Sequence, residues 1–76
     1  MNFEEFINNF AKLFDETEKS EFTAEKEFKQ LDEWSSLHAL LIIAMADEVY
    51  GVKVTGEDIR NSRKVIDIYE IIKSRK

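Results

Sequence analysis

The sequence predicts an all-α fold: a small four-helix bundle with three longer helices, a short third helix, and a long loop between the first two. Apolar residues recur at helical spacing near both ends of the chain, and a nearly continuous apolar run occupies its centre. The chain contains no proline and only two glycines, so little interrupts these segments. With 76 residues there is room for one core, and we expect residues 1–76 to form a single domain.

The first predicted helix begins after Asn2 and extends to about residue 14. Asn2 can cap this helix, and Glu5 stands three residues later, which is the capping-box pattern. The apolar residues fall at i, i+3, i+4, i+7, i+10 and i+11, so they share one face of the helix. They are Phe3, Phe6, Ile7, Phe10, Leu13 and Phe14.

The stretch over residues 15–35 is too sparse in apolar residues for a continuous amphipathic helix. A loop this long is uncommon in a compact domain. Four large apolar residues are spaced along it, namely Phe22, Phe28, Leu31 and Trp34. We therefore expect an ordered loop that is attached to the core at a few points. Trp34 is expected to be such an attachment point, with a platform for a ligand as the alternative.

The second predicted helix covers residues 36–50, and Gly51 ends it as a C′ glycine would. This segment is apolar nearly all round, so a small bundle cannot bury every side of it. The surplus indicates a docking surface. Leu37, Leu41 and Met45, spaced i, i+4 and i+8, would form its ridge; the alternative is that these residues are ordinary core.

Residues 51–54 are expected to be extended, followed by a short helix over about 56–60, for which Thr55 is the cap and Asp58 the N3 residue. A last helix begins after Asn61 or Ser62 as the cap. Its core face comprises Val65, Ile68, Tyr69 and Ile72, and its last turns carry Lys73, Arg75 and Lys76, which complement the helix dipole.

The charge distribution argues against a nucleic-acid partner. The net charge is −5, and residues 15–33 alone hold eight acids and three lysines, while the rest of the chain is balanced. Binding to phosphates needs clustered lysine or arginine, which this chain lacks. An acidic surface suits a basic partner instead, although it could also serve only solubility.

Several chemistries lack the residues they need. There is no cysteine, and the single histidine, His38, cannot build a metal site by itself. His38 and Ser36 are two residues apart on a predicted helix and face different ways, which argues against a catalytic triad. We expect neither catalytic residues nor a metal, and an exposed His38. The start lacks a basic n-region and the apolar run is too short to span a membrane, so the sequence predicts a soluble, cytoplasmic protein.

The order of these segments resembles that of an acyl carrier protein, the small helical protein that carries acyl groups on a 4′-phosphopantetheine arm. Members of that family place a long, partly acidic loop before an Asp-Ser-Leu motif, then an apolar helix, then a Val/Ile-x-Val/Ile connector. The counterparts here are "SSL" at 35–37, "ALLIIAMADEVYG" at 39–51 and "VKV" at 52–54. The resemblance covers essentially the whole chain.

This resemblance implies that Ser36 carries the arm covalently, with Ser35 as a backup attachment site. The thiol of the arm would hold an acyl or aminoacyl group as a thioester, so the protein needs no cysteine. A separate phosphopantetheinyl transferase would attach the arm, and acyl-loading and acyl-processing enzymes of fatty acid, polyketide or related biosynthesis would be the partners. The carrier itself would be a monomer and not an enzyme. Trp34 before the motif resembles the Trp-Asp-Ser-Leu form of D-alanyl carrier proteins and other discrete carriers.

Two departures from the family pattern matter for function. Ser35 replaces the usual aspartate, which leaves open an alternative, an unmodified carrier-like module for protein interaction. The second helix carries His38 and Leu41 where acids are typical, and keeps Asp47 and Glu48. Its docking surface is therefore expected to be more apolar, comprising Leu37, His38, Leu41, Met45, Asp47 and Glu48.

Overall fold

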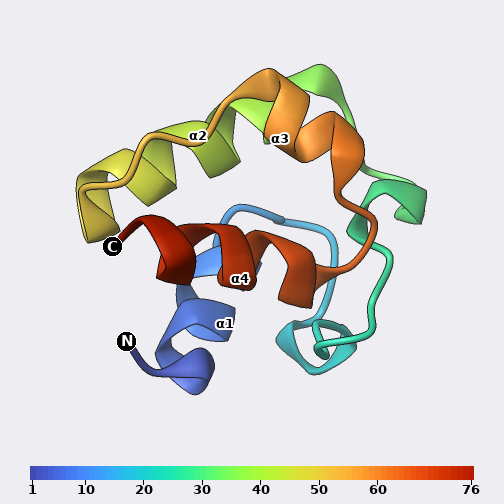
Figure 1. Ribbon diagram of the computed structural model, residues 1–76. Coiled ribbons are helices and arrows are strands. Elements are labelled where there is room, and N and C mark those ends of the chain that lie inside the picture. The colour runs from blue at the N-terminus through green and yellow to red at the C-terminus, as the bar shows by residue number, and fades with distance from the viewer.

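The computed structural model describes all residues, 1–76, and contains four α-helices and no strand. The α-helices are α1 (Phe3–Ala11), α2 (Ser36–Tyr50), α3 (Gly56–Asn61) and α4 (Val65–Arg75). Two short 3₁₀ helices, η1 (Lys19–Glu21) and η2 (Phe28–Gln30), lie in the loop between α1 and α2. The helices α2 and α3 form the upper layer in Figure 1, with α4 and α1 beneath them. The predicted all-α, four-helix class is confirmed. No helix is both long and apolar enough to cross a membrane.

The core is built around aromatic side chains from α1 and the long loop. Phe10 is fully buried, and its ring lies 5.4–5.8 Å from those of four other phenylalanines. These are Phe6, Phe14, Phe22 and Phe28. The core also contains three fully buried isoleucines, Ile42 of α2 and Ile68 and Ile72 of α4. The predicted attachment of the loop through Phe22 and Phe28 is therefore confirmed.

Helix α1 is shorter than predicted, since it ends at Ala11 instead of extending to residue 14. Its start is as expected, because the Asn2 side chain accepts a hydrogen bond from the backbone N–H of Glu5 at 3.1 Å. After Ala11 the backbone changes to the tighter hydrogen-bond pattern of a 3₁₀ turn. Leu13 N–H donates to the Phe10 carbonyl and Phe14 N–H donates to the Ala11 carbonyl. This tighter turn still directs Phe14 into the core, where it is 3% exposed.

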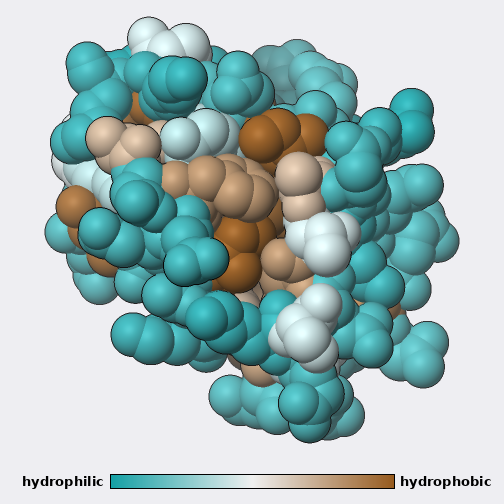
Figure 2. Space-filling model, turned by 90° about the horizontal axis from the view of Figure 1, so that it is seen from below, coloured by the Kyte–Doolittle hydropathy of each residue, from teal (hydrophilic) through white to brown (hydrophobic).

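On the face below α1 in Figure 1, hydrophilic side chains do not cover the hydrophobic ones completely. Figure 2 shows that face, where a band of hydrophobic side chains crosses the middle and hydrophilic side chains surround it. Phe3, Leu13 and Ile66 are among the partly buried hydrophobic residues that pack against the core. Some exposed apolar surface is normal in a domain of this size, because the polar side chains cannot cover all of it.

The start of α4 corrects the prediction that Asn61 or Ser62 is its cap. Lys64 is the N-cap, and Ser62 is buried, donating its hydroxyl to the Asp58 carbonyl at 2.8 Å. The first N–H groups of α4 are bound by the long loop: Val65 donates to the Lys26 carbonyl and Ile66 to the Ala24 carbonyl. The loop thus replaces a side-chain cap.

Lysine side chains also hold the loop to the helices. Lys29 donates to the carbonyls of Ile59 and Arg60, at 2.9 and 3.0 Å, where the last carbonyls of α3 need partners. Lys64 pairs with Glu25 at 2.6 Å. The loop is therefore an ordered part of the domain, as its spaced aromatics predicted.

The connection from α2 to α3 follows the sequence closely. Gly51 has φ 66°, the left-handed conformation that ends a helix and that glycine adopts without strain. Val52 and Val54 are buried, each 3% exposed. Thr55 and Asp58 form the predicted capping box, with bonds of 3.1 and 2.8 Å.

Asp58 also forms a two-bond ion pair with Arg75 at the end of α4, at 2.6 and 3.0 Å. These bonds from Arg75, and that from the Thr55 N–H, hold the pKa of Asp58 well below its ordinary value. Because its folded-state pKa is lowered, the stability that Asp58 contributes is present above its unfolded pKa, near 4, and is lost as the pH falls below it.

We therefore expect Asp58→Asn to lower the free energy of unfolding at pH 7, with a difference from the wild type that shrinks between pH 4 and pH 2. Urea unfolding at a series of pH values measures this. Some acid sensitivity should persist in the variant, because the backbone N–H groups of Lys64 and Arg63 also lower the pKa of Asp67. A difference that stays constant down to pH 2 would contradict the assigned role of Asp58.

Candidate functional site

The two serines singled out in the sequence lie at the N-terminus of α2. Ser35 is the N-cap, with extended backbone at φ −152° and ψ 172°, and Ser36 is the first helical residue; both are exposed. Ser35 therefore occupies the cap position. Its hydroxyl, however, makes no capping bond to the backbone and lies instead 3.2 Å from Nδ1 of His38. Ser36 is exposed to solvent. It lies at the end of α2 where the first backbone N–H groups have no partner within the helix.

His38 corrects the expectation of an exposed histidine. Its side chain is only 12% exposed, and its ring stacks on that of Phe14, with centroids 4.6 Å apart and planes 18° apart. The Trp34 ring lies 6.0 Å away. Its Nε2 atom is 3.4 Å from Oε1 of Glu33. The third helical residue turns back towards the end of α1, which is why His38 joins the aromatic cluster. Its polar partner at the helix start is Ser35, not Ser36.

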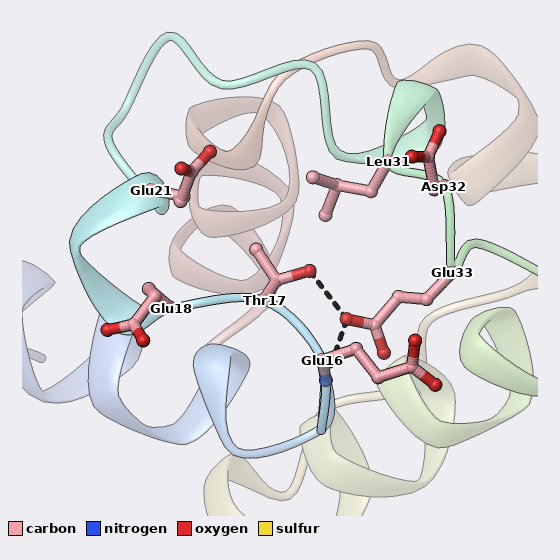
Figure 3. Close-up of a pocket in the computed structure, with 7 residues that line it drawn as sticks. All are labelled: Glu16, Thr17, Glu18, Glu21, Leu31, Asp32 and Glu33. Carbon is pink, nitrogen blue, oxygen red and sulfur yellow. Dashed lines mark hydrogen bonds between the residues drawn. The ribbon is translucent and has the colours of Figure 1, made fainter.

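Glu33 is a site residue that the sequence analysis missed. Its side chain is 9% exposed, and its Oε2 atom accepts hydrogen bonds from the Thr17 hydroxyl and from the Glu16 N–H. Figure 3 shows its carboxylate directed towards both groups across the loop. A signal for this burial was available: Glu33 stands beside Trp34 and two residues after Leu31, both of which pack on the core. Glu33 thus joins the two ends of the long loop immediately before the serines.

A hollow of about 320 Å³ lies next to Glu33, between the two ends of the loop (Figure 3). Five of its seven lining residues are acidic; all seven are Glu16, Thr17, Glu18, Glu21, Leu31, Asp32 and Glu33. Only Glu21 has a lysine partner, Lys26, at 3.3 Å. The loop therefore presents negative charge close to the start of α2, a surface that suits basic groups on a partner.

The predicted docking ridge of Leu37, Leu41 and Met45 does not form at the surface. Leu37 is 60% exposed, but Leu41 is half-buried and Met45, at 6%, belongs to the core. Met45 follows Ser36 by nine residues, two and a half turns, and so faces the opposite side of α2. For Met45 the alternative of ordinary core is correct.

The exposed apolar residues of α2 are instead Leu37, Leu40 and Ala44, with Val49 near the end of the helix. Leu40, which is 62% exposed, follows Ser36 by four residues and therefore shares its face of the helix. Asp47 and Glu48 are exposed at the far end of α2, as expected. The serine and two bare leucines are thus neighbours on one accessible surface.

A second hollow, of about 330 Å³, lies between α1 and α2. Five of its eight lining residues are apolar; the eight are Asn9, Lys12, Leu13, Leu41, Ala44, Met45, Glu48 and Val49. Met45 and Leu41 thus face a groove beside the exposed leucines. This groove is a shallow apolar surface and contains no catalytic grouping.

Glu33 is expected to matter for stability more than its acidic neighbours do. Glu33→Ala should lower the free energy of unfolding by about 2–4 kcal/mol, because it leaves the Thr17 hydroxyl, the Glu16 N–H and His38 without their acceptor. Asp32→Ala, at an exposed residue lining the same hollow, should change it by less than about 0.5 kcal/mol. Urea unfolding of both variants makes the comparison; equal losses would show that Glu33 does not connect the loop.

Compared with protein families, with curated proteins and with solved structures, the chain has no significant match in any of the three. Its function is therefore inferred from its own residues and their geometry.

Proposed function

We propose that this protein is a carrier that holds an acyl or aminoacyl group as a thioester on a 4′-phosphopantetheine arm attached to Ser36. The observation that carries the proposal is the position of Ser36. It is the exposed first residue of a long apolar helix, while the hydroxyl of its neighbour Ser35 is occupied by His38. The order of loop, serine, apolar helix, valine connector and short third helix supports the resemblance to an acyl carrier protein.

The local physics favours an anion at this position. A phosphodiester on Ser36 would lie beside the free N–H groups of the first turn of α2 and the positive end of the dipole of a 15-residue helix. The carrier needs no base of its own, because a phosphopantetheinyl transferase would catalyse the attack of the hydroxyl on coenzyme A. The thiol of the arm would supply the thioester chemistry, so the absence of cysteine is no obstacle.

The surface around Ser36 fits docking by several enzymes in turn. Leu37 and Leu40 present exposed apolar side chains beside the serine. The acidic loop presents negative charge that can attract basic groups of a partner. A shuttle must bind each partner briefly, and a small apolar patch rimmed by charge suits such transient contacts. The transferase and the enzymes that load and process the acyl group are the proposed partners, in fatty acid, polyketide or related biosynthesis.

Attachment of the arm is tested by intact mass spectrometry. Incubation of the folded protein with coenzyme A, magnesium and a phosphopantetheinyl transferase of broad specificity should add the mass of one phosphopantetheine. Circular dichroism confirms that the sample is folded. A folded protein that stays unmodified with several such transferases would count against the carrier proposal.

A second candidate is an unmodified interaction module, and the groove between α1 and α2 favours it. Leu41, Met45 and Val49 line that groove beside the exposed face of α2, so an amphipathic helix of a partner could lay its apolar side there. Such a module would work without any change to Ser36. The two candidates therefore differ in whether the serine hydroxyl is needed.

A further inference from the structure

The side chains of Glu33, His38 and Ser35 form a line of polar contacts near Ser36. The carrier proposal alone assigns no role to these contacts. Oε1 of Glu33 lies 3.4 Å from Nε2 of His38, and Nδ1 of His38 lies 3.2 Å from Oγ of Ser35. Ser35 immediately precedes Ser36. A carboxylate that is nine-tenths buried is thus linked, through one imidazole, to the hydroxyl beside the proposed attachment site.

The inner end of this line has a fixed direction. Oε2 of Glu33 already accepts hydrogen bonds from the Thr17 hydroxyl and the Glu16 N–H, so the carboxylate acts as an acceptor. With Nε2 of His38 only 3.4 Å from Oε1, the tautomer with its hydrogen on Nε2 is favoured, because it avoids two facing lone pairs. The variable atom is Nδ1. In the neutral ring it accepts from the Ser35 hydroxyl, whereas in the imidazolium it donates to Ser35 and turns the hydroxyl hydrogen outward.

Glu33 is the one charged side chain that forms an ion pair with the His38 ring. Phe14 stacks on it and Trp34 lies nearby, and the first turn of α2 contains no acid. The charged residues within two positions of these aromatics in the chain are Lys12, Asp15, Glu16, Asp32 and Glu33, of which only Glu33 forms an ion pair with His38. The negative charge of a phosphodiester at Ser36 would therefore act electrostatically on an imidazole that already has one buried carboxylate beside it.

We propose that Glu33, His38 and Ser35 form a proton relay that responds to the phosphodiester on Ser36. When the arm is attached, His38 takes up a proton from solvent at Nδ1, and the Ser35 hydroxyl turns to donate a hydrogen bond to a phosphodiester oxygen. This inference rests on the proposed function, since it requires the arm on Ser36. Ser35 and His38 are positioning residues here: they fix the base of the arm and supply positive charge beside an acidic loop.

The relay is tested by ³¹P NMR of the modified protein between pH 5 and pH 8.5, together with the titration of the His38 ring protons. A phosphodiester does not itself titrate in this range, so a pH-dependent ³¹P resonance would report on a neighbouring group. We expect the ³¹P resonance to move with the same midpoint as His38.

Two variants separate the relay from a general charge effect. Ser35→Ala should still accept the arm but should lose the pH dependence of the ³¹P resonance, while His38 continues to titrate. His38→Gln should lose that dependence too, and circular dichroism checks that both variants are folded. A ³¹P resonance that stays flat while His38 titrates, or one unchanged by Ser35→Ala, overturns the relay alone. Absence of the added mass overturns the carrier proposal, and the relay with it.

Discussion

Replacing Ser36 by alanine is expected to abolish attachment of the arm completely while leaving the fold intact. The hydroxyl oxygen would be the atom that attacks the phosphate of coenzyme A, so nothing at residue 36 can replace it. Ser36 is exposed at the first position of α2, where alanine is a good helix former, so the free energy of unfolding should change by less than about 0.5 kcal/mol. Intact mass after incubation with the transferase gives the first quantity, and urea unfolding the second.

The matched control is Ser35→Ala, one residue earlier. That variant loses the contact with His38 but keeps the Ser36 hydroxyl, so it should still gain one phosphopantetheine. If Ser36→Ala were still modified and Ser35→Ala were not, Ser35 would be the attachment site. An interaction module would behave differently again, since partner binding would survive in both variants.

Replacing Phe10 by alanine is expected to cause the largest loss of stability. Its ring is fully buried and contacts the aromatic rings of α1 and of the long loop, so alanine would open a cavity where these elements meet. Such a change costs about 3–5 kcal/mol. A domain of 76 residues has about 4–11 kcal/mol in total, so a large part of the stability would be lost. Urea unfolding followed by circular dichroism measures the difference.

Two controls accompany this variant. Phe10→Leu keeps most of the apolar volume and should lose clearly less than the alanine variant. Leu40→Ala removes an apolar side chain that is 62% exposed and should change the free energy of unfolding by only about 0.5 kcal/mol or less. A loss for Phe10→Ala no greater than that for Leu40→Ala would contradict the aromatic core.

Local signals in the sequence were enough to predict a helix end where that end is determined by its own residues. Gly51 could be recognised as the end of α2 because only a glycine takes φ 66° at no cost, and Thr55 and Asp58 marked the start of α3 because their side chains complete its first turn. The same signals failed for α4. Its first N–H groups bind carbonyls of Ala24 and Lys26, about 40 residues earlier in the chain, which no local pattern could reveal.

The site was predicted less completely than the fold. Ser35 and Ser36 were placed correctly at the start of α2 because the apolar run begins there. The choice of exposed residues within that run failed, since a helix that is apolar nearly all round gives no clue to which side meets α1. The pattern therefore leaves both core and surface open for Met45, and it does not single out Leu40 as exposed. Glu33 was counted among many loop acids, because its burial depends on contacts with Thr17 and His38.

The most direct test of the central claim is the mass of the protein isolated from the cells that make it, followed by fragmentation of the peptide containing residues 30–53. We predict that this peptide carries one phosphopantetheine, that the arm is released on fragmentation, and that the remaining mark is on Ser36. Folded protein in which Ser36 is wholly unmodified would contradict the account and favour the interaction module.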